Sequence, residues 1–234
     1  MRKTWAAGIA ERLDCIVRRR RRPLPSCILR PSSLPDRPAI LFDLDGTLID
    51  SIGLLVASME HAYGDREHRP PVEEWIQAIG TPLDAMLRRW ARDDEDVQLL
   101  RARYRDFQFA NHDAMTTAYP GVVETVRELH AAGHPLAIVT SKLAVGARRS
   151  LAFVGIEECF TAVVGIESTT RHKPDAEPVL HALGRIGGVP ASRALFVGDS
   201  THDMHAGSAA GVETAAALWG PYSRAQLATA NPTH

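Results

Sequence analysis

The feature that most constrains this chain is a short apolar segment followed by two acids one residue apart. Ala39 to Phe42 is an uninterrupted apolar run, which predicts a buried β-strand, and Asp43 and Asp45 come directly after it. Alternate side chains of a strand share a face, so both carboxylates are expected to leave the strand tip on one side. Two like charges held this close repel each other unless a cation lies between them. The pair therefore predicts a divalent metal with oxygen ligands.

The six residues from Asp43 to Leu48, DLDGTL, resemble the first motif of the haloacid dehalogenase superfamily in its phosphatase form. The resemblance makes Asp43 a nucleophile that becomes an aspartyl phosphate, and Asp45 a general acid and then a general base. Gly46 allows a sharp turn of the backbone and Thr47 adds a hydroxyl group, and both are predicted to contact phosphate. The simpler alternative is a strand-end turn whose two acids are only solvated.

Charge is distributed unevenly along the 234 residues. Ten of the 27 lysines and arginines, but only three of the 28 acids, lie in residues 1–38. The remaining chain therefore carries 17 basic and 25 acidic residues. An acidic body argues against nucleic acid as the substrate of the core.

Residues 1–38 are expected to be a disordered basic tail rich in proline, or to reflect a start placed upstream of the true one. Arg18 to Arg22 form a block of like charges, and five prolines follow it. The alternatives are an arm for nucleic acid or an anionic surface, and a targeting peptide. No stretch reads as membrane-spanning, and three scattered cysteines fit a reducing compartment. We therefore expect a cytoplasmic protein without a membrane partner.

Residues 52–117 carry the spacing of four amphipathic helices and no strand pattern. Pro70-Pro71, Gly80-Thr81-Pro82 and Asp93-Asp94-Glu95 separate the helices. The resemblance identifies this segment as a helical cap of the type inserted after the first motif, which closes over the phosphate site and selects the substrate. We expect the turn at residues 80–82 to face the chemistry.

From Tyr119 onward, strand and helix patterns alternate. Alternation of this kind predicts an α/β fold, here a Rossmann-like parallel sheet of five or six strands with helices on both faces. The expected core is residues 39–51 and 118–234, and ligands of such a sheet bind beyond the carboxyl ends of the strands. The further strands are predicted at residues 135–140, 160–165, 194–197 and 213–218, and one of the helices at 174–187.

One further strand end and one loop carry candidate phosphate-binding residues. Thr140 and Ser141 end a strand and open a helix, where a hydroxyl and free backbone N–H groups can hold a phosphate. Otherwise Ser141 is only a helix cap. Lys173, followed by a proline, matches the third motif of the superfamily, which implies that it reaches the nucleophile and the phosphoryl oxygens.

Gly198 to Asp203 (GDSTHD) match the fourth motif, two acids four residues apart after a strand. The resemblance makes Asp199 a metal ligand and places Asp203, with Ser200, behind the first ligands, where Asp203 could orient Lys173 or a metal-bound water. Magnesium is then expected on Asp43, on Asp45 through its backbone carbonyl, and on Asp199. The histidines show no zinc-ligand spacing with the cysteines, so we predict no zinc site.

We therefore predict a magnesium-dependent hydrolase of phosphoric monoester bonds that acts on a small phosphorylated metabolite. Residues 171–179 closely resemble the segment in phosphoglycolate phosphatases and related pyrophosphatases, and we favour a phosphoglycolate phosphatase. The alternative is an inorganic pyrophosphatase of the same subfamily, because residues 139–142 and 79–83 resemble its pattern too. A sugar-phosphate mutase fits less well, and either a monomer or a homodimer is compatible with the sequence.

Three other classes of protein are alternatives to this prediction. A phospho-Asp signalling receiver would lack both the second acid of the Asp43/Asp45 pair and the inserted helices. A dehalogenase of the same fold would lack the metal-binding acids. The presence of Asp45 and Asp199 therefore argues against a dehalogenase. The third alternative is a protein without enzymatic activity that binds nucleic acid through Arg18 to Arg22 of the tail.

Overall fold

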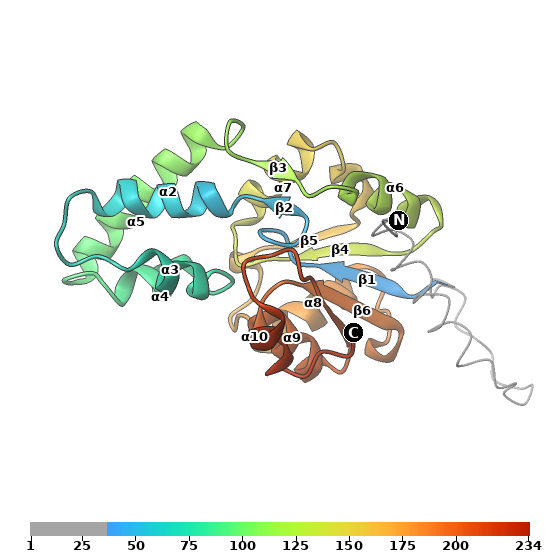
Figure 1. Ribbon diagram of the computed structural model, residues 1–234. Coiled ribbons are helices and arrows are strands. Elements are labelled where there is room, and N and C mark those ends of the chain that lie inside the picture. The colour runs from blue at the N-terminus through green and yellow to red at the C-terminus, as the bar shows by residue number, and fades with distance from the viewer. Residues whose placement is uncertain (1–36) are drawn as a thin grey trace, which may run out of the picture.

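A five-stranded parallel sheet forms the centre of the computed structural model, which describes residues 37–234. The strand order is β5–β4–β1–β6–β7, so β1 lies in the middle (Figure 1). This confirms the predicted parallel α/β fold, with five strands. All but the last two residues of the predicted basic tail, 1–38, lie outside the described residues. The strands are β1 (Ala39–Phe42), β4 (Leu136–Val139), β5 (Ala162–Val164), β6 (Ala194–Gly198) and β7 (Glu213–Ala216).

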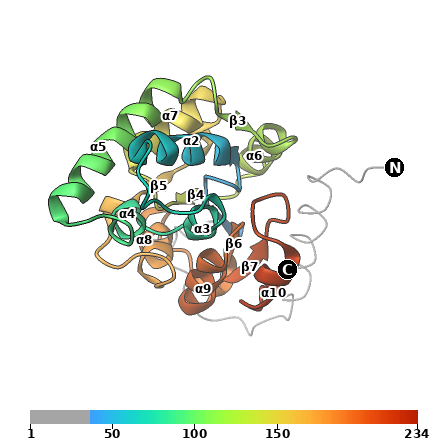
Figure 2. The same cartoon turned by 60° about the vertical axis from the view of Figure 1, so that its left-hand side comes forward.

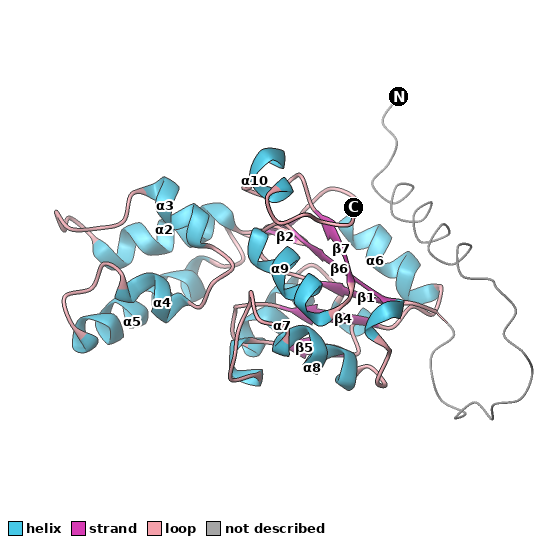
Figure 3. Cartoon of the chain, turned by 90° about the horizontal axis from the view of Figure 1, so that it is seen from below, coloured by secondary structure: helices cyan, strands magenta, loops and turns pink. Residues whose placement is uncertain are grey.

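Helices cover both faces of the sheet (Figure 3). The side chains of β1, β4, β5 and β6 alternate between two apolar cores. In β1, Ile40 and Phe42 pack with α6 and α7, whereas Leu41 packs with α8 and α9. A strand buried on both faces has no polar alternation, which explains the continuous apolar run. The helices on the two faces are α6 (Val122–Ala131), α7 (Ala144–Phe153), α8 (Glu177–Arg185) and α9 (Thr201–Ala210). A short helix, α10 (Arg224–Ala228), follows near the C-terminus.

Four further helices, called the cap helices below, group together beyond the carboxyl end of β1 (Figures 1 and 2). They pack around an apolar cluster of their own that includes Met59, Trp75 and Leu100. The chain leaves the core through β2 (Ile49–Asp50) and returns through β3 (Thr117–Ala118), which pair antiparallel. We propose that residues 52–117 form a cap on a core of residues 39–51 and 118–234. The cap helices are α2 (Ile52–Tyr63), α3 (Val72–Ala78), α4 (Leu83–Arg88) and α5 (Asp94–Asn111).

One predicted helix boundary is wrong. The helix predicted from Pro174 begins at Glu177 instead. The N–H of Asp175 donates to the carbonyl of His172 (2.8 Å), which forms a turn, and the carboxylate of Asp175 accepts from the N–H of Glu177 (2.8 Å). Local side-chain bonding thus delays the helix. No helix within residues 37–234 combines the length and the apolar character needed to cross a membrane.

Candidate active site

The loop after β1 places Asp43 at the carboxyl edge of the sheet. The N–H of Asp43 still donates to the carbonyl of Val197 in β6 (2.9 Å), so the sheet fixes the backbone of this residue. The next turn depends on Gly46, whose φ of +88° is one that side chains with a Cβ rarely adopt. A Cβ at Gly46 would lie 2.3 Å from Oδ2 of Asp199. Glycine therefore permits both the turn and the close approach of Asp199.

Lys173 lies buried between two carboxylates. Its Nζ donates to Oδ1 of Asp43 and to Oδ1 of Asp203, each at 2.7 Å. Burial by itself lowers the pKa of Lys173, but Asp203 and Asp43 outweigh it and raise the pKa above its ordinary value. The structure thus places Lys173 in contact with Asp43, as the sequence predicts, and also with Asp203. The orienting role of Asp203 stays a prediction.

Asp43, Asp199 and Asp203 form an acidic cluster, with one carboxylate oxygen of each lying within 4.8 Å of the others. Burial raises the pKa of Asp43 to about 7 against the opposing charge of Lys173. Burial, followed by the charge of Asp43, also raises the pKa of Asp199 well above its ordinary value. One ammonium group cannot balance three buried carboxylates, so the cluster fits a divalent cation with oxygen ligands.

The bonds within the cluster separate the oxygens that are free for a metal from those that are engaged. Both oxygens of Asp203 are engaged, Oδ1 with Lys173 and Oδ2 with the N–H and hydroxyl of Ser200. Oδ1 of Asp199 accepts from Thr47 (2.6 Å), which leaves Oδ2. Magnesium would therefore be held by Asp43 and Asp199, with Asp203 supporting them.

Asp45 does not join this cluster. Its Oδ1 accepts from the hydroxyl of Ser51 (2.6 Å) and from Nζ of Lys142 (2.6 Å). The metal set predicted from the sequence includes Asp45 only through its backbone carbonyl, which remains compatible with this placement. Lys142 carried no predicted role. Its position directly after the Thr140-Ser141 pair at a strand end was the signal that could have identified it.

The end of β4 supplies the opposite wall. The hydroxyl oxygen of Thr140 accepts from the N–H of Lys142 (3.1 Å), so its proton is available to a phosphoryl oxygen. Ser141 instead donates its hydroxyl to the carbonyl of Gly80 (2.5 Å), in the turn between α3 and α4. Ser141 thus connects the core to the cap helices, and only its backbone N–H is left for the predicted phosphate contact.

Two other predicted phosphate contacts have a different use in this structure. Thr47 is completely buried, and its hydroxyl donates to Asp199. The N–H of Gly46 donates to the carbonyl of Ile49 (2.8 Å). Both residues therefore position the acidic cluster rather than face a substrate, because their polar atoms are already engaged. The sequence identified these residues but not the partner that each one has.

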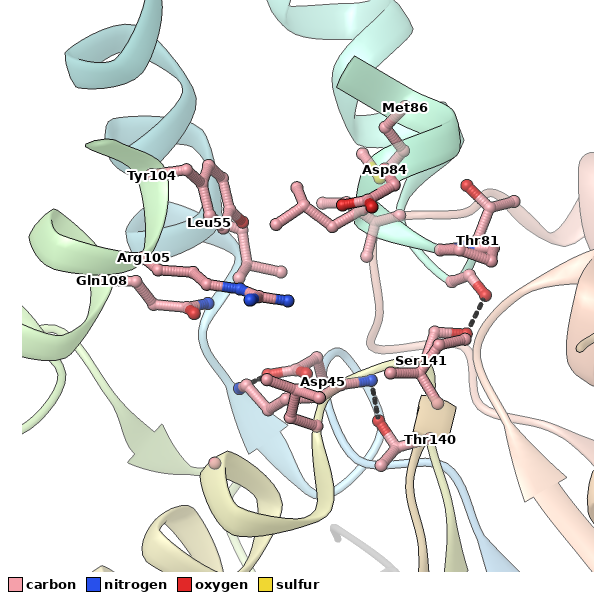
Figure 4. A pocket seen from close by; sticks show the side chains of 18 of the residues that line it. Asp45, Leu55, Thr81, Asp84, Met86, Tyr104, Arg105, Gln108, Thr140 and Ser141 are labelled. Carbon is pink, nitrogen blue, oxygen red and sulfur yellow. Dashed lines mark hydrogen bonds and ion pairs between the residues drawn. The ribbon is translucent and has the colours of Figure 1, made fainter. Parts of the chain in front are cut away.

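A cavity of about 590 Å³ lies between this edge of the sheet and the cap helices (Figure 4). Asp43, Asp45, Thr140, Ser141 and Lys142 line it from the core. The turn at residues 80–82 lines it from the other side, as expected from the sequence. Tyr104, Arg105 and Gln108 of α5 also reach it (Figure 4). The cavity joins a candidate phosphate site to a wall that can select the rest of a substrate.

Comparison with known proteins gives a consistent result. Residues 40–217 match the family described as haloacid dehalogenase-like hydrolase. Pyrophosphatase PpaX of Bacillus velezensis is 40% identical over 185 residues, covering 77% of this chain and 83% of that protein. Pyrophosphatase PpaX of Halalkalibacterium halodurans is 37% identical over 180 residues, covering 75% and 81%.

Solved structures of similar shape include a predicted phosphoglycolate phosphatase from Haemophilus somnus, with a TM-score of 0.77 and 26% identity. The match covers 86% of this chain and 93% of that one. Protein Tyrosine Kinase A of Mycobacterium tuberculosis has a TM-score of 0.65 and 32% identity, covering 82% and 88%. The fold is therefore shared by proteins whose names describe different phosphoryl chemistry.

Proposed function

Since the chain belongs to the haloacid dehalogenase-like hydrolases and is a phosphatase of that family, we propose that it uses magnesium and an aspartyl-phosphate intermediate to hydrolyse a small phosphate compound. The observation that carries the proposal is the acidic cluster beside Lys173, at the carboxyl edge of the sheet and under the cap helices. Bound magnesium would neutralise charge on the phosphoryl group and allow an anionic substrate to approach an anionic nucleophile.

In the first step, an oxygen of Asp43 attacks phosphorus, and the bond from phosphorus to the leaving oxygen breaks. Asp45 gives its proton to that oxygen. Lys173 and the hydroxyl of Thr140 stabilise the charge on the equatorial phosphoryl oxygens. Lys142 must release Asp45 before the acid can hold a proton, and incoming phosphoryl oxygens offer Lys142 an alternative anionic partner.

In the second step, Asp45 takes a proton from a water molecule whose oxygen attacks phosphorus. The bond between phosphorus and Asp43 breaks, which releases phosphate and regenerates the carboxylate of Asp43. The bonds from Ser51 and Lys142 to Oδ1 of Asp45 suit this step, because they stabilise the ionised carboxylate that must accept the proton.

Pyrophosphate and 2-phosphoglycolate are the proposed substrates. Relatives named pyrophosphatase are 37% and 40% identical to this chain, which supports pyrophosphate. The structural neighbour named as a predicted phosphoglycolate phosphatase supports 2-phosphoglycolate. The resemblance of residues 171–179 fits both substrates. Both are small anions that the cavity between core and cap can hold.

The direct test measures phosphate release from both compounds, from nucleotides and from sugar phosphates, with and without magnesium. We expect magnesium-dependent turnover that Asp43→Asn abolishes while the far-UV spectrum and melting temperature are retained. Asp50→Asn, at an exposed carboxylate on β2, is the matched control and should remain active. Turnover by Asp43→Asn, or turnover that a chelator leaves intact, would reject the mechanism.

A further inference from the structure

The cations that line the cavity differ in whether they have an acidic partner. Nζ of Lys142 lies 2.6 Å from Asp45, and a guanidinium nitrogen of Arg149 lies 3.0 Å from Asp113. Arg105 also lines the cavity, yet its guanidinium group has no ion pair or hydrogen bond with any other residue of the range 37–234. A guanidinium group remains charged at all physiological pH values. An unpaired, permanent positive charge therefore borders the space above the reacting groups.

The position of Arg105 on α5 directs this charge inward. Tyr104, Arg105 and Gln108 lie on one face of the helix, since residues three and four apart are neighbours on a helix surface. Figure 4 shows the guanidinium group of Arg105 pointing into the cavity, on the side of the loop that carries Asp45. The acid at Asp84, which also lines the cavity, is already paired with Arg101 at 2.6 Å.

We propose that Arg105 is a specificity-determining residue that binds a second anionic group on the substrate, beyond the phosphoryl group that is transferred. This inference rests on the proposed function, because it takes Asp43 as the group that receives the phosphoryl. Asp45 protonates the leaving oxygen, so whatever is attached to that oxygen lies between Asp45 and the cap helices. The wall it meets there includes Arg105.

The favoured substrate class follows from the chemistry of that leaving group. In pyrophosphate the leaving group is itself a phosphate, and in 2-phosphoglycolate it carries a carboxylate. Either anion can accept paired N–H bonds from a guanidinium, which are stronger than bonds between neutral groups. A neutral alcohol offers no charge to Arg105 and leaves its cation without a partner. Arg105 thus favours leaving groups that are anionic over those that are neutral.

The test compares 2-phosphoglycolate with 2-hydroxyethyl phosphate, which is similar in size but has no carboxylate, and adds pyrophosphate as a second anionic substrate. Arg105→Gln should lower kcat/KM for both anionic substrates by about tenfold or more, the loss expected for one charge-assisted bond. It should leave kcat/KM for 2-hydroxyethyl phosphate unchanged. Arg105→Lys should restore part of the preference because it keeps the charge.

Arg103→Gln is the matched control, since Arg103 is exposed on the same helix and does not line the cavity. This variant should leave kcat/KM unchanged for all three substrates. An equal loss on charged and neutral substrates, or no loss in Arg105→Gln, would overturn the role of Arg105 while leaving the phosphatase assignment intact. A wild-type protein that hydrolyses none of the three would reject the proposed function, and the inference with it.

Discussion

Nζ of Lys173 lies 2.7 Å from Oδ1 of Asp43, although the two residues are 130 positions apart in the chain. The contact forms because Asp43 ends the central strand, and the loop before α8 brings Lys173 to the same edge of the sheet. Lys173 is therefore part of the balance of charge that allows three buried carboxylates to lie together. The same contact places an ammonium group beside the predicted nucleophile, where it can also stabilise phosphoryl oxygens.

Lys173→Met should destabilise the metal-free protein by about 3–5 kcal/mol, because it leaves Asp43 and Asp203 buried without their counter-charge. Urea denaturation in the presence of a chelator measures this loss. Arg171→Met, at an exposed arginine of the same loop, should change stability little. Equal stability of Lys173→Met and wild type would mean that the carboxylates are neutralised in another way.

Magnesium should raise the melting temperature of the wild-type protein, because a ligand that binds only the folded state stabilises it. A magnesium concentration of 100 times Kd corresponds to about 2.7 kcal/mol. Asp199→Asn should abolish the shift, since it removes the charge of a carboxylate whose Oδ2 is free for the metal. Asp106→Asn, at an exposed acid on α5, should keep it. A full shift in Asp199→Asn would remove Asp199 from the metal site.

Gly220→Ala should impair the site without removing any charged group. A Cβ at Gly220 would lie 2.4 Å from Cβ of Asp199, a distance at which one of the two must move. We expect weaker magnesium binding in thermal titrations and lower turnover. Gly53→Ala is the control, because a Cβ there meets nothing within 4 Å, and it should stabilise α2 by about 0.5–1 kcal/mol. Normal magnesium binding by Gly220→Ala would show that the backbone can yield at this point.

The decrease in folding stability between neutral and acidic pH should depend in part on Asp96 of α5. Hydrogen bonds from Arg66 lower the pKa of Asp96, with burial opposing them and Arg92 adding to them. The pKa of Asp96 is therefore lower in the folded state than the unfolded value of about 3.9. The ionised carboxylate stabilises the folded protein above that pH, and this stabilisation is lost as the pH falls through the folded-state pKa. Asp96→Asn should therefore cost about 1–3 kcal/mol at pH 7, and its deficit should shrink below about pH 4.

The matched control for this measurement is Glu95→Gln, because Glu95 is exposed on the same helix. Urea denaturation of the three proteins between pH 3 and 7 gives the comparison. A deficit in Asp96→Asn that stays constant across the range would assign the stabilisation to packing instead of to charge.

The strand-end positions of the functional residues could be predicted from the sequence. Apolar runs buried on both faces identify the strands, and parallel strands bring their carboxyl ends to one edge. Asp43, Thr140 and Asp199 could be grouped in this way before any coordinates were known. The start of α8 could not, because the carboxylate of Asp175 bonds to the backbone where the pattern alone predicted helix.

The sequence by itself determined the sheet, the inserted helices and the residue types that meet beneath them, because these follow from apolar periodicity and from motifs at strand ends. Only the tertiary structure decided which partner each polar atom has. In the folded protein, the side chain of Thr47 donates a hydrogen bond to Asp199, that of Ser141 to Gly80, and that of Lys142 to Asp45. Such pairings depend on distances of a few ångströms between segments far apart in the chain. The spacing of residues along the sequence does not encode those distances.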